Sequence, residues 1–88
     1  SEENAREIET IHLLTRAIEL SGGSGNNWAM LSLVGIRMQQ IDPTFKLKNT
    51  GHSRLIFLIK YFNEVFELKK AKKGKRGDLV RIRKPSDN

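Results

Sequence analysis

The sequence contains no cysteine and only two histidines among its 88 residues. The lack of cysteine excludes disulfide bonds and thiolate metal sites, and it fits a chain from a reducing cytoplasm. Neither His12 nor His52 has partner ligands at metal-binding spacing, so we predict no metal and no cofactor. Acidic residues are scattered, with no pair placed for acid–base chemistry, so we expect neither catalysis nor a small-molecule substrate.

Long apolar runs are also missing. The longest covers residues 55–59, between Arg54 and Lys60, whereas a membrane span needs ~18 residues. We therefore predict no membrane segment and no signal peptide. Because the N-terminus is acidic and lacks an initiator Met, we interpret the chain as a fragment of a larger protein. Its length predicts one domain over residues 1–88, with a loose tail at residues 85–88.

Basic residues gather in the second half of the chain. Residues 1–41 hold three basic and five acidic residues, a net charge of −2, whereas residues 42–88 hold thirteen and five, a net charge of +8. A basic half on a small domain attracts polyanions. Nucleic acid is the commonest partner of a chain with such a charge asymmetry. Charge alone leaves two alternatives open: binding to an anionic membrane, or a basic surface that only keeps the chain soluble.

Apolar spacing predicts a first helix over residues 4–20, where apolar residues recur at intervals of three and four. Asn4 and Glu7 resemble a capping box at its start. The glycine-rich residues 21–25 end the helix, and they predict a linker rather than a phosphate-binding loop because no Lys-Ser/Thr pair follows. A short strand at residues 27–29 is expected to hold Trp28 against the core.

Two further helices are predicted before residue 64. Ser32 is the expected N-cap of the second, which ends near residue 41 before Pro43. Gly35 in its middle suggests close approach by another element. The third helix is expected over residues 53–63. Its predicted inward face consists of Leu55, Leu58, Ile59 and Phe62.

The remaining sequence predicts a hairpin. Residues 66–70 and 79–84 form its strands, and the basic, glycine-containing residues 71–77 form its loop. The order helix, short strand, helix, helix, hairpin predicts an α+β fold of the winged-helix type, with the hairpin as the wing. About ten residues separate the second and third helices, more than the three or four of a DNA-reading helix-turn-helix, so major-groove recognition is not favoured.

Two groups of polar and basic residues are the predicted nucleic-acid contacts. The first surrounds the start of the third helix, where unpaired backbone N–H groups favour phosphate. The second lies on the wing, where six cations within eight residues exceed what solubility requires. The first group is Lys46, Lys48, Asn49, His52, Ser53 and Arg54, and the second is Lys69, Lys70, Lys72, Lys73, Lys75, Arg76, Arg81 and Arg83.

Four large apolar residues fall outside the predicted inner faces of the second and third helices, namely Leu33, Ile36, Phe57 and Tyr61. Exposed together they would form a protein-docking surface. The other interpretation, which we favour from the sequence, is that the first helix or the N-terminal arm covers them.

The run from Trp28 to Phe66 resembles the LOTUS domain, also called OST-HTH. Thr50 departs from the family pattern, which often has an aromatic residue there, and Ile56, Phe57 and Tyr61 stand where more polar residues are expected. The residues that carry the resemblance are Trp28, Leu31-Ser32, Gly35, Phe45, Lys48-Asn49-Thr50-Gly51, Arg54-Leu55, Leu58-Ile59 and Phe66.

The resemblance implies a non-catalytic winged helix that binds RNA, with G-rich or G-quadruplex RNA as the expected ligand. Many bacterial members are C-terminal modules of proteins with a PIN-like NYN nuclease domain, which implies that this module recruits RNA to a linked nuclease. Some other members bind a DEAD-box helicase, so a protein-interaction module that docks a helicase or its own nuclease domain is the alternative.

Overall fold

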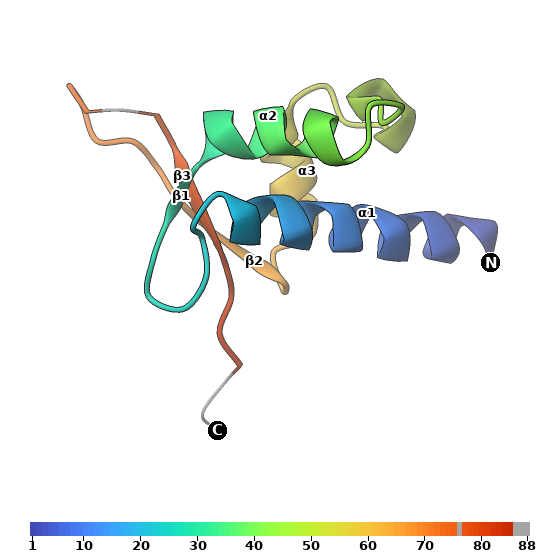
Figure 1. Cartoon of the computed structure of the whole chain (residues 1–88), viewed down its shortest axis with the longest axis horizontal. Coiled ribbons are helices and arrows are strands. Elements are labelled where there is room, and N and C mark those ends of the chain that lie inside the picture. Colours follow the sequence, from blue (N-terminus) through green and yellow to red (C-terminus); the bar gives the residue numbers. More distant parts are fainter. Residues whose placement is uncertain (76, 86–88) are drawn as a thin grey trace.

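The computed structural model describes residues 1–75 and 77–85. Arg76, predicted as a wing contact, lies outside them, as does the predicted loose tail except for Pro85. The described residues form three α-helices and a three-stranded antiparallel sheet. In Figure 1 the helices lie to one side of the sheet, and the hairpin of the last two strands extends past them. This is the predicted mixture of helices and hairpin in a winged-helix-like arrangement.

Helix α1 covers Glu2–Leu20 and begins two residues earlier than predicted. The expected capping box at Asn4 is wrong, because Ser1 is the N-cap and its Oγ accepts a hydrogen bond from the Asn4 N–H at 3.2 Å. Glu2 and Glu3 in the first turn also suit the positive end of the helix dipole. After Ser21, the Gly23 N–H donates to the Ile18 carbonyl at 2.8 Å and closes the helix.

Strand β1, Ala29–Met30, runs directly into helix α2, Leu31–Ile41. Ser32 is therefore not the N-cap, and no side chain caps this helix. Instead the Leu31 N–H donates to the Asp78 carbonyl at 3.0 Å, so the hairpin satisfies one of the four N–H groups that have no partner within the helix. The close approach predicted at Gly35 is also absent: an added Cβ would lie at an ordinary 3.6 Å from Leu55 Cδ2.

A 3₁₀ helix, η1, covers Leu47–Thr50 and ends at Gly51 in the left-handed conformation, with φ 82°. Helix α3 follows at Leu55–Tyr61 and is shorter than predicted. Leu58, Ile59 and Phe62 are buried as expected. Ile56, expected at a more polar position, is buried as well, whereas Leu55 is only half-buried.

The hairpin consists of β2, Phe66–Lys69, and β3, Leu79–Ile82, and β3 lies between β2 and β1. Ala29 pairs with Val80, which in turn pairs with Leu68, so these residues share the face that meets the helices. Helix α1 packs against α2 and β3, and α3 packs against β2. The largest fully buried side chains between these layers are Phe66, Leu14, Ile18, Leu58, Ile59, Val34 and Val80.

Candidate nucleic-acid interface

The described lysines of the hairpin are all exposed. Lys69 ends β2, and Lys70, Lys72, Lys73 and Lys75 follow in the hairpin loop, which we define as residues 70–78. The loop is held at its base, because the carboxylate of Asp78 accepts a hydrogen bond from the Ala71 N–H at 2.8 Å. The chain thus presents a dense set of ammonium groups on an anchored loop.

An open hollow of about 540 Å³ lies at the base of this loop. Met30 and Leu79, from neighbouring strands, supply its apolar part together with Ala71. Lysines supply the rest of its lining, namely Lys69, Lys70, Lys72 and Lys75. A concave apolar surface surrounded by positive charge suits a ligand that is both flat and anionic.

Two more hollows connect this region with the chain before α3. The second, about 360 Å³, shares Met30 with the first, and Gly35 and Leu55 also line it. The third, about 150 Å³, shares Gly35 and Leu55 with the second and extends to Phe45 and Leu47. The shared lining residues form a path from the hairpin lysines to η1.

The predicted residues around the start of α3 lie at the far end of this path. Lys46, Lys48 and Asn49 are exposed on or next to η1, while Arg54 occupies the N-cap position of α3 without a side-chain cap bond. Ser53 is exposed, and the half-buried His52 has its ring 5.1 Å from that of Tyr61. Their chain neighbours Phe45, Leu47 and Leu55 line the third hollow, which places this group beside the far end of the path.

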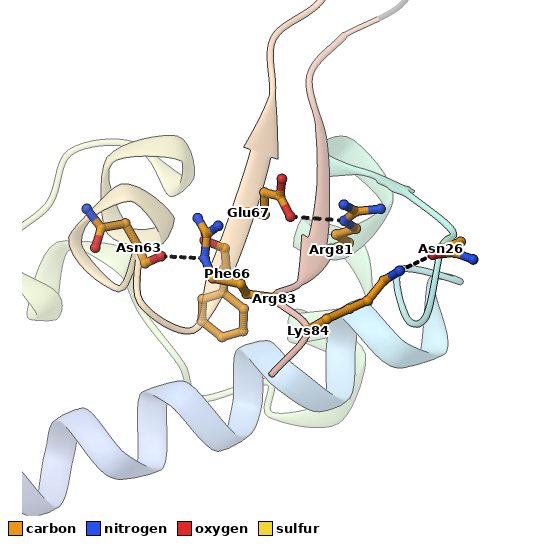
Figure 2. A network of polar contacts seen from close by, with 7 residues as sticks. All are labelled: Asn26, Asn63, Phe66, Glu67, Arg81, Arg83 and Lys84. Carbon is orange, nitrogen blue, oxygen red and sulfur yellow. Dashed lines mark hydrogen bonds and ion pairs between the residues drawn. The ribbon is translucent and has the colours of Figure 1, made fainter. Parts of the chain in front are cut away.

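Arg81 and Arg83 are engaged within the fold (Figure 2). Arg81 Nε lies 3.1 Å from Glu67 Oε1 across the β2–β3 pair. Arg83 Nε donates to the Asn63 carbonyl at 3.0 Å and Arg83 Nη2 to the Phe66 carbonyl at 3.3 Å. Figure 2 also shows Lys84 bonded to Asn26 in the loop before β1. Arg81 thus links β3 to β2, while Arg83 and Lys84 fasten the end of the sheet that lies away from the hollow.

Trp28 is a feature that the sequence interpretation misplaced. It is half-buried and lies outside the hydrophobic core cluster, so the expected packing against the core is wrong. The guanidinium of Arg81 lies 4.2 Å from the centroid of its ring, and Lys69 Nζ lies 5.6 Å from it. Because side chains alternate along a strand, the burial of Ala29 turns Trp28 and Met30 outward. Ala29 rather than Trp28 faces the core because Val80 and Gly23 leave little room for a larger side chain at that position.

The apolar candidates are largely uncovered, contrary to the interpretation that we favoured. Ile36 is 55% exposed, Phe57 44% and Tyr61 57%, and only Leu33 is half-buried. The reason is geometric: α1 packs on α2 and β3 and leaves the outer side of α3 open.

A polar contact joins α1 to α3, where the Tyr61 hydroxyl donates to Glu7 Oε2 at 2.7 Å. This hydrogen bond, and then the negative charge of Glu7, raise the pKa of the Tyr61 phenol above its ordinary value. Phe57 lies one turn before Tyr61 on the same face of α3, and its ring centroid is 5.9 Å from Arg54 Cζ and 6.0 Å from Lys60 Nζ. The exposed aromatic residues of α3 are therefore set among polar and charged groups.

Within residues 1–75 and 77–85, no three His, Asp or Glu side chains come close enough to hold a metal ion. No helix in the same residues is both long and apolar enough to cross a membrane. The described surface offers charge, aromatic rings and open hollows, which is the chemistry of a binding module.

A three-helix, three-strand domain with this surface defines the class of small winged-helix-like binding modules. The family profile of the OST-HTH/LOTUS domain matches residues 6–77, and the chain belongs to this family. OST-HTH/LOTUS domains are non-catalytic modules that bind RNA or protein.

A solution NMR structure of an uncharacterized protein from Nitrosomonas europaea is similar in fold, with a TM-score of 0.68 and 20% sequence identity. The similarity covers 89% of this chain and 76% of that one. No curated protein matches the chain significantly.

Proposed function

We propose that this chain is an RNA-binding module that recruits RNA to a linked nuclease domain. The observation that carries the proposal is the hollow at the base of the hairpin loop, lined by Lys69, Lys70, Lys72 and Lys75. Lysine contacts to phosphate supply most of the affinity of a nucleic-acid complex. Lys46 and Lys48 at the other end of the path of hollows would extend the contact along the strand.

The proposed ligand is G-rich RNA, including G-quadruplexes, because the family resemblance implies it. RNA is favoured over duplex DNA because α3 has seven residues and follows α2 after a long connection, a geometry unlike that of a major-groove reading helix.

The test is a titration of the chain with G-quadruplex RNA, unstructured RNA and duplex DNA at two salt concentrations. We expect both RNAs to bind more tightly than duplex DNA, and G-quadruplex RNA to bind most tightly. Duplex DNA as the best ligand would instead indicate a DNA-binding winged helix. Failure of all three ligands to bind would remove the proposal.

A second candidate function is protein docking, to a DEAD-box helicase or to the nuclease domain of the same protein. Ile36, Phe57 and Tyr61 favour it because they are large, apolar and exposed. The basic hollow lies on other residues, so the two functions could use different surfaces of one domain.

A further inference from the structure

The outer face of the sheet combines an aromatic ring with cations in fixed positions. Trp28 stands one step before the Ala29–Val80 pair, which places it beside Arg81. Arg81 is held from the other side by Glu67, so both members of the stacked pair have restricted motion. Two preorganised planar groups bind a third planar group with little loss of side-chain entropy.

The neighbouring hollow continues this face. Met30 and Leu79 are paired across β1 and β3, next to Trp28 and Arg81 in the same register, and both line the hollow. Lys69 connects the two features, because it lines the hollow and its Nζ lies 5.6 Å from the Trp28 ring. Met30 and Leu79, which we call the apolar strip, therefore form one surface with the Trp28 ring, and lysines lie at the border of this surface.

Phosphate contact alone would leave this apolar strip unused. A nucleobase is flat, largely apolar on its faces and linked to phosphates on both sides, so it matches the strip and the lysines together. Bases inside a duplex are stacked on each other and cannot reach such a surface, whereas an unpaired base in a single strand or a loop can.

We propose that this face, made of Trp28, Met30, Leu79 and Arg81, binds an unstacked base of the RNA while the hairpin lysines bind its flanking phosphates. The proposal rests on the proposed function, since it takes RNA as the ligand. It adds a base-binding site that phosphate contact does not require. The two acidic residues nearby do not oppose it, because Glu67 is paired with Arg81 and Asp78 with the Ala71 N–H.

The test uses the fluorescence of Trp28, which is the one tryptophan in the chain. The whole chain is titrated with a short unstructured RNA and, separately, with an abasic strand of the same length and charge. We expect the RNA to quench Trp28 and to bind roughly tenfold more tightly than the abasic strand, which should leave the fluorescence unchanged.

Two variants sharpen the comparison. Trp28→Leu should lose about tenfold in affinity for the RNA and nothing for the abasic strand. Phe57→Ala is the matched control, since it removes another exposed aromatic ring with cations nearby and should keep both the quenching and the affinity difference. If Trp28→Leu does not fold, quenching of Trp28 in the natural chain by RNA, compared with the abasic strand, still tests the base site.

Equal affinity for both strands without quenching would overturn the base site and leave the proposed function standing. Failure of both strands to bind would overturn both proposals together. Tighter binding of the RNA than of the abasic strand without quenching of Trp28 would place the base contact on other residues and would overturn this base site as well.

Discussion

Gly23 is the residue at which the packing leaves no room for a side chain. An added Cβ would come within 2.6 Å of Ile18 Cγ2, 2.9 Å of the Val80 carbonyl oxygen and 3.0 Å of Ala29 Cβ. Its carbonyl also accepts a hydrogen bond from the Ile82 N–H at 2.9 Å. This glycine fixes the end of α1 to the sheet, a role that its place in a glycine-rich stretch does not reveal.

We therefore expect opposite effects from two glycine substitutions. Gly23→Ala should destabilise the fold by roughly 1–3 kcal/mol, because backbone as well as side chains must shift. Gly35→Ala should stabilise it by about 0.5–1 kcal/mol, since Gly35 is helical and its Cβ would have space. Denaturant unfolding measures both. Equal effects of the two substitutions would contradict the packing described around Gly23.

Phe57 allows a residue-scale test of the exposed side of α3. Because Phe57 is 44% exposed, Phe57→Ser should leave the melting temperature and the RNA affinity nearly unchanged. If the second candidate function holds, the same substitution removes association with the protein partner.

The core substitution Leu58→Ser is the matched control for Phe57→Ser. It should cost several kcal/mol, about 3 or more, because it leaves a cavity and buries a hydroxyl. Thermal unfolding separates the two variants. A loss of stability at Phe57 as large as that at Leu58 would mean that α1 covers the ring after all.

At the scale of elements, the hairpin loop carries the densest group of positive charges in the proposed interface, with Lys70, Lys72, Lys73 and Lys75 within six residues. Lys72→Ala with Lys75→Ala should weaken RNA binding roughly tenfold near physiological salt, since each lost phosphate contact removes the release of a counterion. The fold should be unaffected because both side chains are exposed.

Arg6→Ala with Arg16→Ala is the control for the lysine pair, with the same change in net charge on α1. It should leave RNA affinity within about twofold of the natural chain, since neither arginine lines the three hollows and exposed charges outside the contact are largely screened by salt. Equal losses from both pairs would mean that only net charge matters. Fluorescence anisotropy with labelled RNA measures both.

Apolar periodicity predicted the helices and the hairpin because burial of one face determines these elements. It could not predict their ends, which depend on single hydrogen bonds. Ser1 rather than Asn4 caps α1, and the Asp78 carbonyl, distant in sequence, receives the first N–H of α2. The Ser1 cap is a local contact, whereas the contact of Leu31 with Asp78 joins distant residues and leaves no local pattern in the sequence.

The candidate site was predictable in its charge but not in its shape. The lysines of the hairpin stand out in the sequence, whereas the outward position of Trp28 depends on which face of β1 meets the helices. Alternation places Trp28 and Ala29 on opposite faces, and size suggests that the tryptophan is the buried one. The register with Val80 and the tight contact at Gly23 reverse that expectation.

At the scale of the whole molecule, charge is separated in space as well as in sequence. The acidic N-terminal end of α1 points away from the sheet, and the hairpin extends on the other side (Figure 1). This arrangement gives the domain an electrostatic polarity that turns the hairpin toward a polyanion during encounter. An acidic half and a basic half, rather than a uniform charge of +6, then determine how RNA approaches.

The salt dependence of RNA affinity tests this account most directly. If the hairpin lysines and the basic residues before α3 neutralise about four to six phosphates, the logarithm of the association constant should fall with the logarithm of salt concentration at a slope of about −3 to −4 for a single strand. The measurement is a series of anisotropy titrations of the natural chain across salt concentrations. An affinity that does not change with salt would contradict the account.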